Sequence, residues 1–437
     1  MLREHQPNYK KLEHITPQPL EHLLRRLVRS DWHDDLEVQK KLIMDITAML
    51  VAHDTQATTG TEFRSCIHSI THLFADLEQN GDVHCRVVQY PESDRTALII
   101  APSEDCPAIE EVINSFESGS AEQESVPIEN TVIHFHIDTV PIARGKHALA
   151  TLDTFFDPRT GLMYGRGPND MKGQASLASP LARLAIKAGK KPPVFVITTD
   201  EETHGKEGGL KLLQKLKSTW LTIDWEPVAG HAGSYVDGIL PGLCIGLPAI
   251  DHTTLADLVR VQSMLEQQFT KGMCLPMASS SQGEVLLGLS THNLDHEPDE
   301  LIDELLAVAR WGKIVPAGYF RYSVGQSRKT QCELDPVKKK IVVESLRQHF
   351  PWQPSRRTVS HVSSSDAGYF GRLHRHAMYY GNIDTLTFMA YRNLPNVIDI
   401  GIDEAGGGRH SETEAAQLDQ LVSLLHSTLA IHVKMCG

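Results

Sequence analysis

The fold is decided by one short stretch of the chain, Val194-Phe195-Val196-Ile197-Thr198-Thr199-Asp200-Glu201-Glu202. Residues 194–197 are apolar and mostly β-branched, two prolines precede them, and three glycines follow within a few residues. Such a run predicts a buried strand of a parallel sheet. The three carboxylates that follow raise one another's pKa unless a cation lies nearby. Alone, they are more simply interpreted as solvated acids at the start of a helix, so other motifs must decide between the two interpretations.

The rest of the first half of the chain alternates between helical and strand patterns. Apolar residues at helical spacing predict two helices within residues 17–54 and another over 61–77. Further elements are predicted as strands over 83–89, 96–100 and 131–137, and as a helix over 175–188. This order favours an α/β fold with a mostly parallel sheet. The acidic, poorly periodic segment 103–130 is interpreted as a surface insertion.

After Glu226-Pro227 the pattern changes. The predicted order is a strand region over 230–247, a helix over 253–269, a strand over 284–290, a helix over 299–310 and a strand over 317–324. This order resembles a β-α-β-β-α-β (ferredoxin-like) α+β sandwich inserted into the first domain. Helices over 336–350 and 413–433, with strands near 377–380 and 397–400, return to the first pattern. We therefore predict a discontinuous domain of residues 1–230 and 335–437 that is interrupted by a smaller domain of residues 231–334.

Composition limits the classes of function. The 437 residues carry a formal net charge of −13 with no basic block, which argues against nucleic acid or an anionic membrane as the main partner. We expect no membrane-spanning segment and no signal peptide, because no apolar stretch is long enough and the first residues are polar. The seven cysteines form no C-x-x-C pair, so a disulfide framework is not expected and a cytoplasmic location is the simplest.

Two motifs precede the acidic triplet. His136-Ile137-Asp138 ends a predicted strand, where alternation directs both polar side chains to one side. A metal-bound imidazole usually donates its other N–H to a carboxylate, although an isolated motif of this kind more often belongs to a core histidine. Residues 165–173 predict a tight glycine-rich loop around Asp170, and they lack the spacing of phosphate-binding loops.

A set of two imidazoles and three carboxylates emerges from these motifs and from later positions: His136, Asp170, Glu202, Glu226 and His410. Most of them lie at strand ends or just beyond, where ligands of open α/β sheets collect. Imidazole and carboxylate without thiolate suit Zn²⁺ or another first-row divalent ion. One carboxylate shared between two ions is typical of two-metal hydrolases.

These motifs resemble those of a known family. Residues 136–141, 165–173 and 199–202 are similar, in order and spacing, to the motifs of the di-zinc deacylase and carboxypeptidase family. That family includes acetylornithine deacetylase, succinyl-diaminopimelate desuccinylase, aminoacylase and glutamate carboxypeptidase. The resemblance covers residues 131–227 and returns more loosely at 364–367 and 410–414. It implies that the discontinuous domain is catalytic and that residues 231–334 form a lid or dimerisation domain.

The resemblance implies roles around the first metal. His136 would bind this metal, with Asp138 orienting the imidazole, and Asp170 would be the bridging carboxylate. Glu226 would complete the first metal's shell. A glutamate at this position looks like the deacylase and carboxypeptidase branch, whereas the aminopeptidase branch has aspartate.

The resemblance also implies roles around the second metal. Glu202 and His410 would bind it, with Glu414 nearby in support. Glu201 would be the general base that takes a proton from a water bridging the two metals and passes it to the leaving amine. No role is implied for Asp200. The expected activity is hydrolysis of an N-acyl amino acid or of a C-terminal peptide bond.

Cofactor and partners follow from the same resemblance. It implies two Zn²⁺ per chain, with Co²⁺ or Mn²⁺ as substitutes, a small N-acyl amino acid or peptide as substrate, and a homodimer through the inserted domain. The family's inserted domain usually carries a substrate-binding histidine and arginine. The candidates here are His231, His292 and Arg328, and each histidine is more simply a loop residue.

Two alternatives to a deacylase or carboxypeptidase stay open. One is a dipeptidase or aminopeptidase of the same family. The other is a metal-binding scaffold without catalysis, which has no need for the base Glu201.

Overall fold

The structure is a computed structural model. It describes residues 11–91, 93–118, 126–143, 148–203, 208–225, 227, 235–240, 243–249, 277–281, 284–291, 321–324, 334–350, 356–360, 396–402 and 411–437. The chain separates into two compact units. One unit comprises Met1–Asp237, Glu333–Arg357 and Leu394–Gly437, and the other comprises Gly238–Cys332 and Thr358–Asn393. The domain boundaries at residues 230 and 335 stay a prediction.

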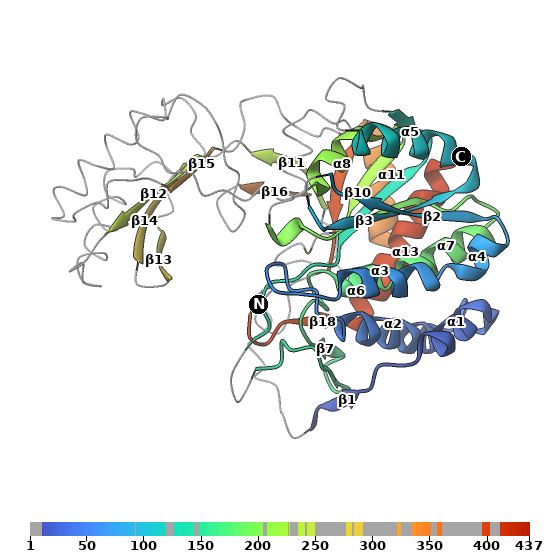
Figure 1. Ribbon diagram of the computed structural model, residues 1–437, viewed down its shortest axis with the longest axis horizontal. Helices are drawn as coiled ribbons and strands as arrows, with labels where there is room; N and C mark the ends of the chain where they lie inside the picture. Colours follow the sequence, from blue (N-terminus) through green and yellow to red (C-terminus); the bar gives the residue numbers. More distant parts are fainter. Residues whose placement is uncertain are drawn as a thin grey trace. The chain divides into compact units, whose positions relative to one another are not determined.

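The largest sheet among the described residues has eight strands in the order β16-β11-β17-β10-β5-β8-β3-β2 (Figure 1). The four strands β17, β10, β5 and β8 run parallel, whereas β3, β2 and β11 pair antiparallel with their neighbours. The bounds are β2 (Val83–Gln89), β3 (Thr96–Pro102), β5 (Thr131–His136), β8 (Val194–Thr198), β10 (Leu221–Asp224), β11 (Tyr235–Leu240), β16 (Arg356–Ser360) and β17 (Val397–Ile400).

The sheet is therefore mixed, and the prediction of a mostly parallel sheet holds only for its central strands. The strand predicted from residue 194 is β8, which is buried along its whole length and pairs in parallel with β5. β2 and β3 pair antiparallel because only residues 90–95 connect them. A parallel connection needs a crossover of a dozen or more residues.

Helices cover both faces of this sheet. α5 and α8 lie on one side of β2 and β3, and α3, α4 and α7 lie on the other (Figure 1). α13 packs against α2, α7 and α11. The bounds are α1 (Leu20–Val28), α2 (Leu36–Val51), α3 (Phe63–His72), α4 (Ala75–Gln79), α5 (Cys106–Glu117), α6 (Lys172–Ala175), α7 (Ala178–Lys187), α8 (Gly209–Lys215), α11 (Pro336–His349) and α13 (Leu418–Met435), with the 3-10 turns η2 (Ser30–Trp32), η3 (Ser103–Asp105) and η4 (Glu201–Thr203).

The interpretation of residues 103–130 as a surface insertion was wrong for α5. Ile109, Val112, Ile113 and Phe116 are buried and recur at the helical spacing that defines an apolar face. The acidic and serine-rich residues around this helix obscured that short pattern. The helix predicted over 61–77 is also interrupted, as α3 and α4, whereas the helix predicted over 175–188 is confirmed as α7.

Smaller sheets complete the described architecture. A four-stranded sheet has the order β1 (Glu13–Ile15), β6 (Thr154–Asp157), β7 (Leu162–Tyr164) and β18 (Ala415–Gln417), and β4 (Val126–Ile128) pairs with β9 (Leu216–Ser218). In the second unit an antiparallel sheet has the order β13 (Met277–Ser281), β14 (Glu284–Thr291), β12 (Leu243–Ala249) and β15 (Arg321–Val324). The helices predicted over 253–269 and 299–310 and the strand near 377–380 lie outside the described residues, so the ferredoxin-like arrangement stays a prediction.

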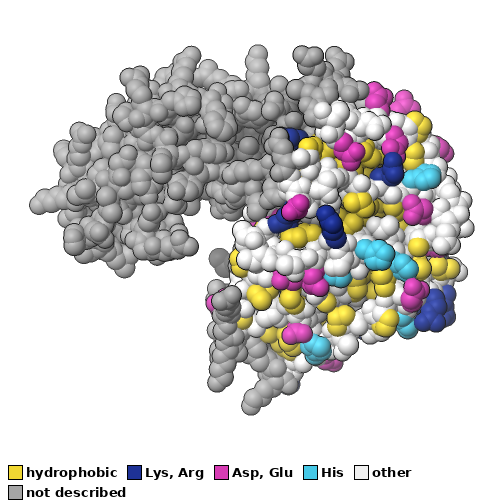
Figure 2. Space-filling view, in the orientation of Figure 1, with side chains coloured by type: hydrophobic (Ala, Val, Ile, Leu, Met, Phe, Trp, Pro, Cys, Tyr) yellow, Lys and Arg dark blue, Asp and Glu magenta, His cyan; other side chains and the backbone are white. Residues whose placement is uncertain are grey.

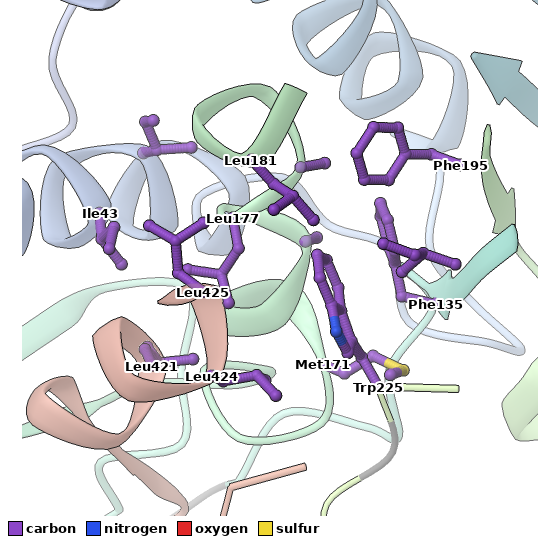
Figure 3. Packing of buried hydrophobic residues seen from close by; sticks show 14 of the residues in the cluster. Ile43, Phe135, Met171, Leu177, Leu181, Phe195, Trp225, Leu421, Leu424 and Leu425 are labelled. Carbon is purple, nitrogen blue, oxygen red and sulfur yellow. The ribbon is translucent and has the colours of Figure 1, made fainter. Parts of the chain in front are cut away.

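One apolar core joins the central strands to the helices beneath them. Phe135 of β5 stacks on Trp225, which follows β10, with ring centroids 5.6 Å apart, and Phe195 of β8 lies against the same indole (Figure 3). Leucines of α7 and α13, including Leu181 and Leu424, belong to the same cluster. The core therefore holds the adjacent strands β5, β8 and β10 together.

The described surface has no large region of one charge on the face shown in Figure 2, where acidic and basic side chains are interspersed. Within the same described ranges, no helix is long and apolar enough to cross a membrane.

A buried histidine on α13 makes the stability of this core depend on pH. Nε2 of His432 donates to the carbonyl oxygen of Lys191 at 2.8 Å, and the ring is fully buried. Burial lowers the pKa of His432 to about 4, although the bond to the carbonyl opposes that shift. The unfolded chain takes up this proton near pH 6.5, whereas the folded chain does not until about pH 4, so stability falls as the pH is lowered through this window.

We expect a His432→Gln variant to lose this part of the pH dependence, since a glutamine amide can donate to Lys191 and does not titrate. The wild type should lose about 3 kcal/mol more than the variant between neutral pH and pH ~4. Urea unfolding at the two pH values measures the difference. Equal losses in the two proteins would show that folding does not lower the pKa of His432.

Candidate active site

The candidate site lies at the carboxyl ends of two parallel strands. His136 is the last residue of β5 and lies opposite Thr198, the last residue of β8. Asp138 follows β5, and η4 carries Glu201 and Glu202 just beyond β8. Parallel pairing brings these two strand ends to the same edge of the sheet, so residues more than 60 positions apart in the sequence become neighbours.

The His136 imidazole is the centre of the site. Its Nε2 lies 2.9 Å from Oδ1 of Asp170 and 3.9 Å from Oε2 of Glu201. Its Nδ1 donates to the backbone carbonyl of Asp138 at 3.0 Å, and the Asp138 carboxylate is 3.4 Å away. A proton held on Nδ1 directs Nε2 toward the carboxylates, which is the arrangement of a metal-binding histidine.

The electrostatics of this cluster favour a positive charge. Burial alone would lower the pKa of His136, but hydrogen bonds to Asp138 and Asp170 and the charge of Glu201 outweigh it and raise that pKa well above its ordinary value. His136, Asp138 and Asp170 are almost completely buried, whereas the Glu201 side chain is 17% exposed. Buried carboxylates grouped around one imidazole are stable only with a compensating cation or hydrogen-bond donors.

Asp138 contacts more than the imidazole. Its two carboxylate oxygens accept the backbone N–H groups of Glu201 at 3.1 Å and of Glu202 at 2.8 Å. The motif His136-Ile137-Asp138 predicted only an interaction with the ring. Asp138 therefore links the end of β5 to the turn that carries the two glutamates.

The glycine-rich loop around Asp170 is organised by a distant carboxylate. Oε1 of Glu414 accepts the backbone N–H groups of Gly167, Asn169 and Asp170 at 3.0, 3.2 and 3.2 Å. Oε2 accepts from the guanidinium of Arg166, which is also buried. Burial raises the pKa of Glu414 to about 7, although Arg166 favours the ionised carboxylate. Glu414 thus supports the loop from behind, and Arg166 is a residue of this site that the sequence analysis missed.

Close packing at Gly173 and burial of Met171 fix the conformation of the rest of the glycine-rich loop. A Cβ on Gly173 would overlap the backbone carbonyl of Pro168, so this position requires glycine. Met171, next to Asp170, is fully buried and points into the cluster that contains Trp225 and Phe135 (Figure 3). The backbone at Asp170 is thereby held by the buried Met171 side chain on one side and by the Glu414 contact on the other.

The structure brings together one part of the predicted site. His136, Asp138, Asp170, Glu201 and Glu202 lie at one edge of the sheet, and Glu414 lies behind the loop. The predicted ligands Glu226 and His410 and the predicted substrate-binding residues His231, His292 and Arg328 lie outside the described residues. Within the described part, no three His, Cys, Asp or Glu side chains form a complete metal site. The donors that are described, one imidazole nitrogen and carboxylate oxygens, are of the kind that Zn²⁺ prefers.

We expect Glu414→Gln to destabilise the protein by about 3–5 kcal/mol, because the buried Arg166 would lose its counter-charge. The glutamine NH2 group would also face the N–H donors that surround the Glu414 carboxylate, where only an acceptor can form a hydrogen bond. Unfolding in urea at neutral pH measures the effect. Glu412→Gln is the matched control, since the Glu412 side chain is exposed, and it should change stability by less than about 0.5 kcal/mol. Similar unfolding midpoints for the two variants would contradict the role of Glu414.

Solved structures share this fold. Human carnosine dipeptidase 1 superposes with a TM-score of 0.58 at 11% identity, covering 96% of this chain and 100% of that chain. A dipeptidase from Saccharomyces cerevisiae has a TM-score of 0.54 at 12% identity, covering 95% of this chain and 98% of that chain. At these identities the similarity shows the fold alone.

Sequence comparisons add relatives and a family. The chain is 34% identical over 94 residues to a succinyl-diaminopimelate desuccinylase of Xylella fastidiosa, covering 21% of this chain and 24% of that protein. It is 35% identical over 95 residues to the same enzyme of Rickettsia akari, covering 21% and 24%. The match therefore spans about a quarter of the length of these curated relatives. The family model described as peptidase family M20/M25/M40 matches residues 132–431, which is more than half of the chain. These motifs and this match identify the chain as a member of peptidase family M20/M25/M40.

Proposed function

We propose that this protein is a metal-dependent hydrolase that cleaves the amide bond of an N-acyl amino acid or a C-terminal peptide bond. The observation that carries the proposal is the convergence of His136, Asp170 and Glu201 at one edge of the sheet, with Nε2 of His136 directed toward both carboxylates. Membership of the peptidase family and the partial match to desuccinylases support the same class of reaction.

The metal ligands in this proposal are His136, Asp170, Glu202, Glu226 and His410. Two Zn²⁺ per chain would fit the chemistry of this set, with Co²⁺ or Mn²⁺ as substitutes, and Asp170 would contribute its carboxylate to both. A bound metal pair supplies Lewis acidity, which activates water and polarises the scissile carbonyl. The hydrogen bond from Nδ1 to the Asp138 carbonyl keeps Nε2 of His136 available as a ligand atom.

Glu201 is the general base in this proposal. Its backbone is fixed by Asp138, and its partly exposed side chain lies with Oε2 3.9 Å from Nε2 of His136. The carboxylate accepts a proton from the attacking water and delivers it to the leaving nitrogen, which would otherwise depart as an unstable amide anion. Glu202 has a different role in this proposal. As a metal ligand it must stay ionised, whereas the base Glu201 must bind and release a proton.

The remaining features of the proposal concern substrate, assembly and location. Residues 231–334 act as a lid or dimerisation domain, His231, His292 and Arg328 are the candidates for substrate contacts, and the assembly is a homodimer. A cytoplasmic location is supported by the described cysteines Cys66, Cys85, Cys106 and Cys436, which are free thiols.

A panel of N-acyl amino acids, C-terminally blocked and unblocked peptides, and free dipeptides tests the reaction, with the protein loaded with Zn²⁺ or Co²⁺. Release of an acyl group or of a C-terminal residue supports the proposal. Cleavage restricted to free dipeptides, or from the N-terminus, indicates the dipeptidase or aminopeptidase alternative. Fewer than two metals per chain together with no hydrolysis indicates the non-catalytic scaffold.

On the best substrate of that panel, we expect Glu201→Gln to lower kcat by about 10²–10⁴-fold, because the amide cannot accept the proton. Elemental analysis should still find the wild-type metal content in this variant. Glu202→Gln should instead lose metal as well as activity. Glu37→Gln, an exposed position on α2, is the matched control and should leave both unchanged. Full turnover by Glu201→Gln would rule out its assignment as the base.

A further inference from the structure

Asp200, the first acid of the triplet, is completely buried and makes contacts unlike those of its two neighbours. Oδ2 accepts the backbone N–H groups of Gly208 at 3.0 Å and Gly209 at 3.1 Å. Oδ1 accepts the hydroxyl of Tyr90 at 3.1 Å, and that side chain is also buried. Asp200, which directly precedes η4, therefore connects this turn to the first turn of α8 and to the segment between β2 and β3.

The β2–β3 connection contacts the same segment at a second point. The backbone N–H of Tyr90 donates to the carbonyl of Arg95 at 3.0 Å, which closes the turn. The Arg95 guanidinium donates to the carbonyl of Thr199 at 3.0 Å and to that of Ala57, and it lies 3.6 Å from the centre of the Phe63 ring. The two ends of this turn thus hold Thr199 and Asp200, the residues that lead from β8 into Glu201.

Two glycines allow this close approach. A Cβ on Gly208 would overlap the Tyr90 ring, and a Cβ on Gly209 would overlap the Asp200 carboxylate. Gly208 also has φ 155°, a conformation that side chains other than glycine rarely adopt. The sequence Gly208-Gly209 is therefore required by the positions of Tyr90 and Asp200 rather than by the start of a helix alone.

The acidic triplet is consequently held from both sides. Asp138 accepts the N–H groups of Glu201 and Glu202, and Asp200 accepts those of Gly208 and Gly209. A third carboxylate beside two others raises the electrostatic cost of the site. Its presence is explained if the hydrogen bonds from Tyr90, Gly208 and Gly209 hold the base and the ligand in place.

We infer that Asp200, together with Tyr90, is a positioning residue that sets where Glu201 and Glu202 lie, and that it neither binds metal nor exchanges a proton. The inference rests on the proposed function for the roles of Glu201 and Glu202. The hydrogen bonds of Asp200 to the two glycines do not depend on that function, so they can be tested separately.

Asp200→Asn and Tyr90→Phe test the inference, each in the full-length chain. An asparagine keeps one acceptor oxygen where aspartate has two, and its neutral amide weakens the charge-assisted hydrogen bonds at this position in either orientation. Phenylalanine removes only the hydroxyl. The matched control is Asp105→Asn. Asp105 is also a buried carboxylate with two donors, Asn130 at 2.8 Å and Lys191 at 3.0 Å, and these donors precede β5 and β8, so the control lies at the opposite edge of the sheet.

Three measurements are made on each variant: hydrogen exchange of the peptide that contains Gly208 and Gly209, affinity for Co²⁺ alone by calorimetry, and kcat and KM on the substrate found in the panel. We expect Asp200→Asn to accelerate exchange at these two amides, to weaken Co²⁺ binding, and to lower kcat by about 10–100-fold with little change in KM. Tyr90→Phe should show the same pattern with a smaller decrease, of roughly 3–10-fold in kcat. Asp105→Asn should lower the unfolding midpoint while keeping kcat and Co²⁺ affinity.

Unchanged exchange at Gly208 and Gly209 in Asp200→Asn would overturn the inference. So would a loss of kcat and Co²⁺ affinity no larger than that of Asp105→Asn. A wild-type protein that neither binds Co²⁺ nor cleaves any panel substrate would instead refute the proposed function. In that case the exchange data alone would decide whether Asp200 holds the segment.

Discussion

The parallel register of β5 and β8 is the constraint on which the candidate site depends. Because His136 lies opposite Thr198, the residues just beyond the two strands meet within hydrogen-bonding distance, and Asp138 reaches the backbone of Glu201 and Glu202. A shift of one residue would turn His136 toward the opposite face of the sheet and remove this contact. The register is in turn held by the core on the other face, where Phe135 stacks on Trp225.

Carboxylates at this edge are tolerated because they divide into two groups. Asp138, Asp200 and Glu414 accept seven backbone N–H groups between them, from both sides of the acidic triplet and from the loop that carries Asp170. Hydrogen bonds to an ionised carboxylate are stronger than neutral ones, and they offset its burial. Asp170, Glu201 and Glu202 are the carboxylates that the proposed function assigns to metal and water. The first group holds the protein scaffold, and the second is assigned to the chemistry.

Sequence reasoning reached the elements and residues whose signal is local. β8 followed from a short apolar run. Local motifs and the family resemblance pointed to His136, Asp138, Asp170, Glu201 and Glu202, whose roles stay predictions. It missed α5, whose apolar face is short and surrounded by acids. It also missed the contacts of Arg166 and Tyr90, because their partners Glu414 and Asp200 lie 248 and 110 residues away in the sequence. Such pairs depend on the folded arrangement of distant segments, and no periodicity or spacing in the sequence marks them.

The two groups of carboxylates should respond differently to substitution. A carboxylate that accepts several backbone amides cannot be replaced without leaving buried donors unsatisfied, so its loss affects stability and geometry together. A carboxylate whose proposed role is to exchange a proton with the reacting groups differs in this respect, because its replacement by the isosteric amide removes that proton exchange directly. Stability and activity should therefore vary together at Asp138, Asp200 and Glu414 and vary separately at Glu201. The acidic triplet contains both kinds in adjacent positions, which is possible because successive residues of an irregular turn point in different directions.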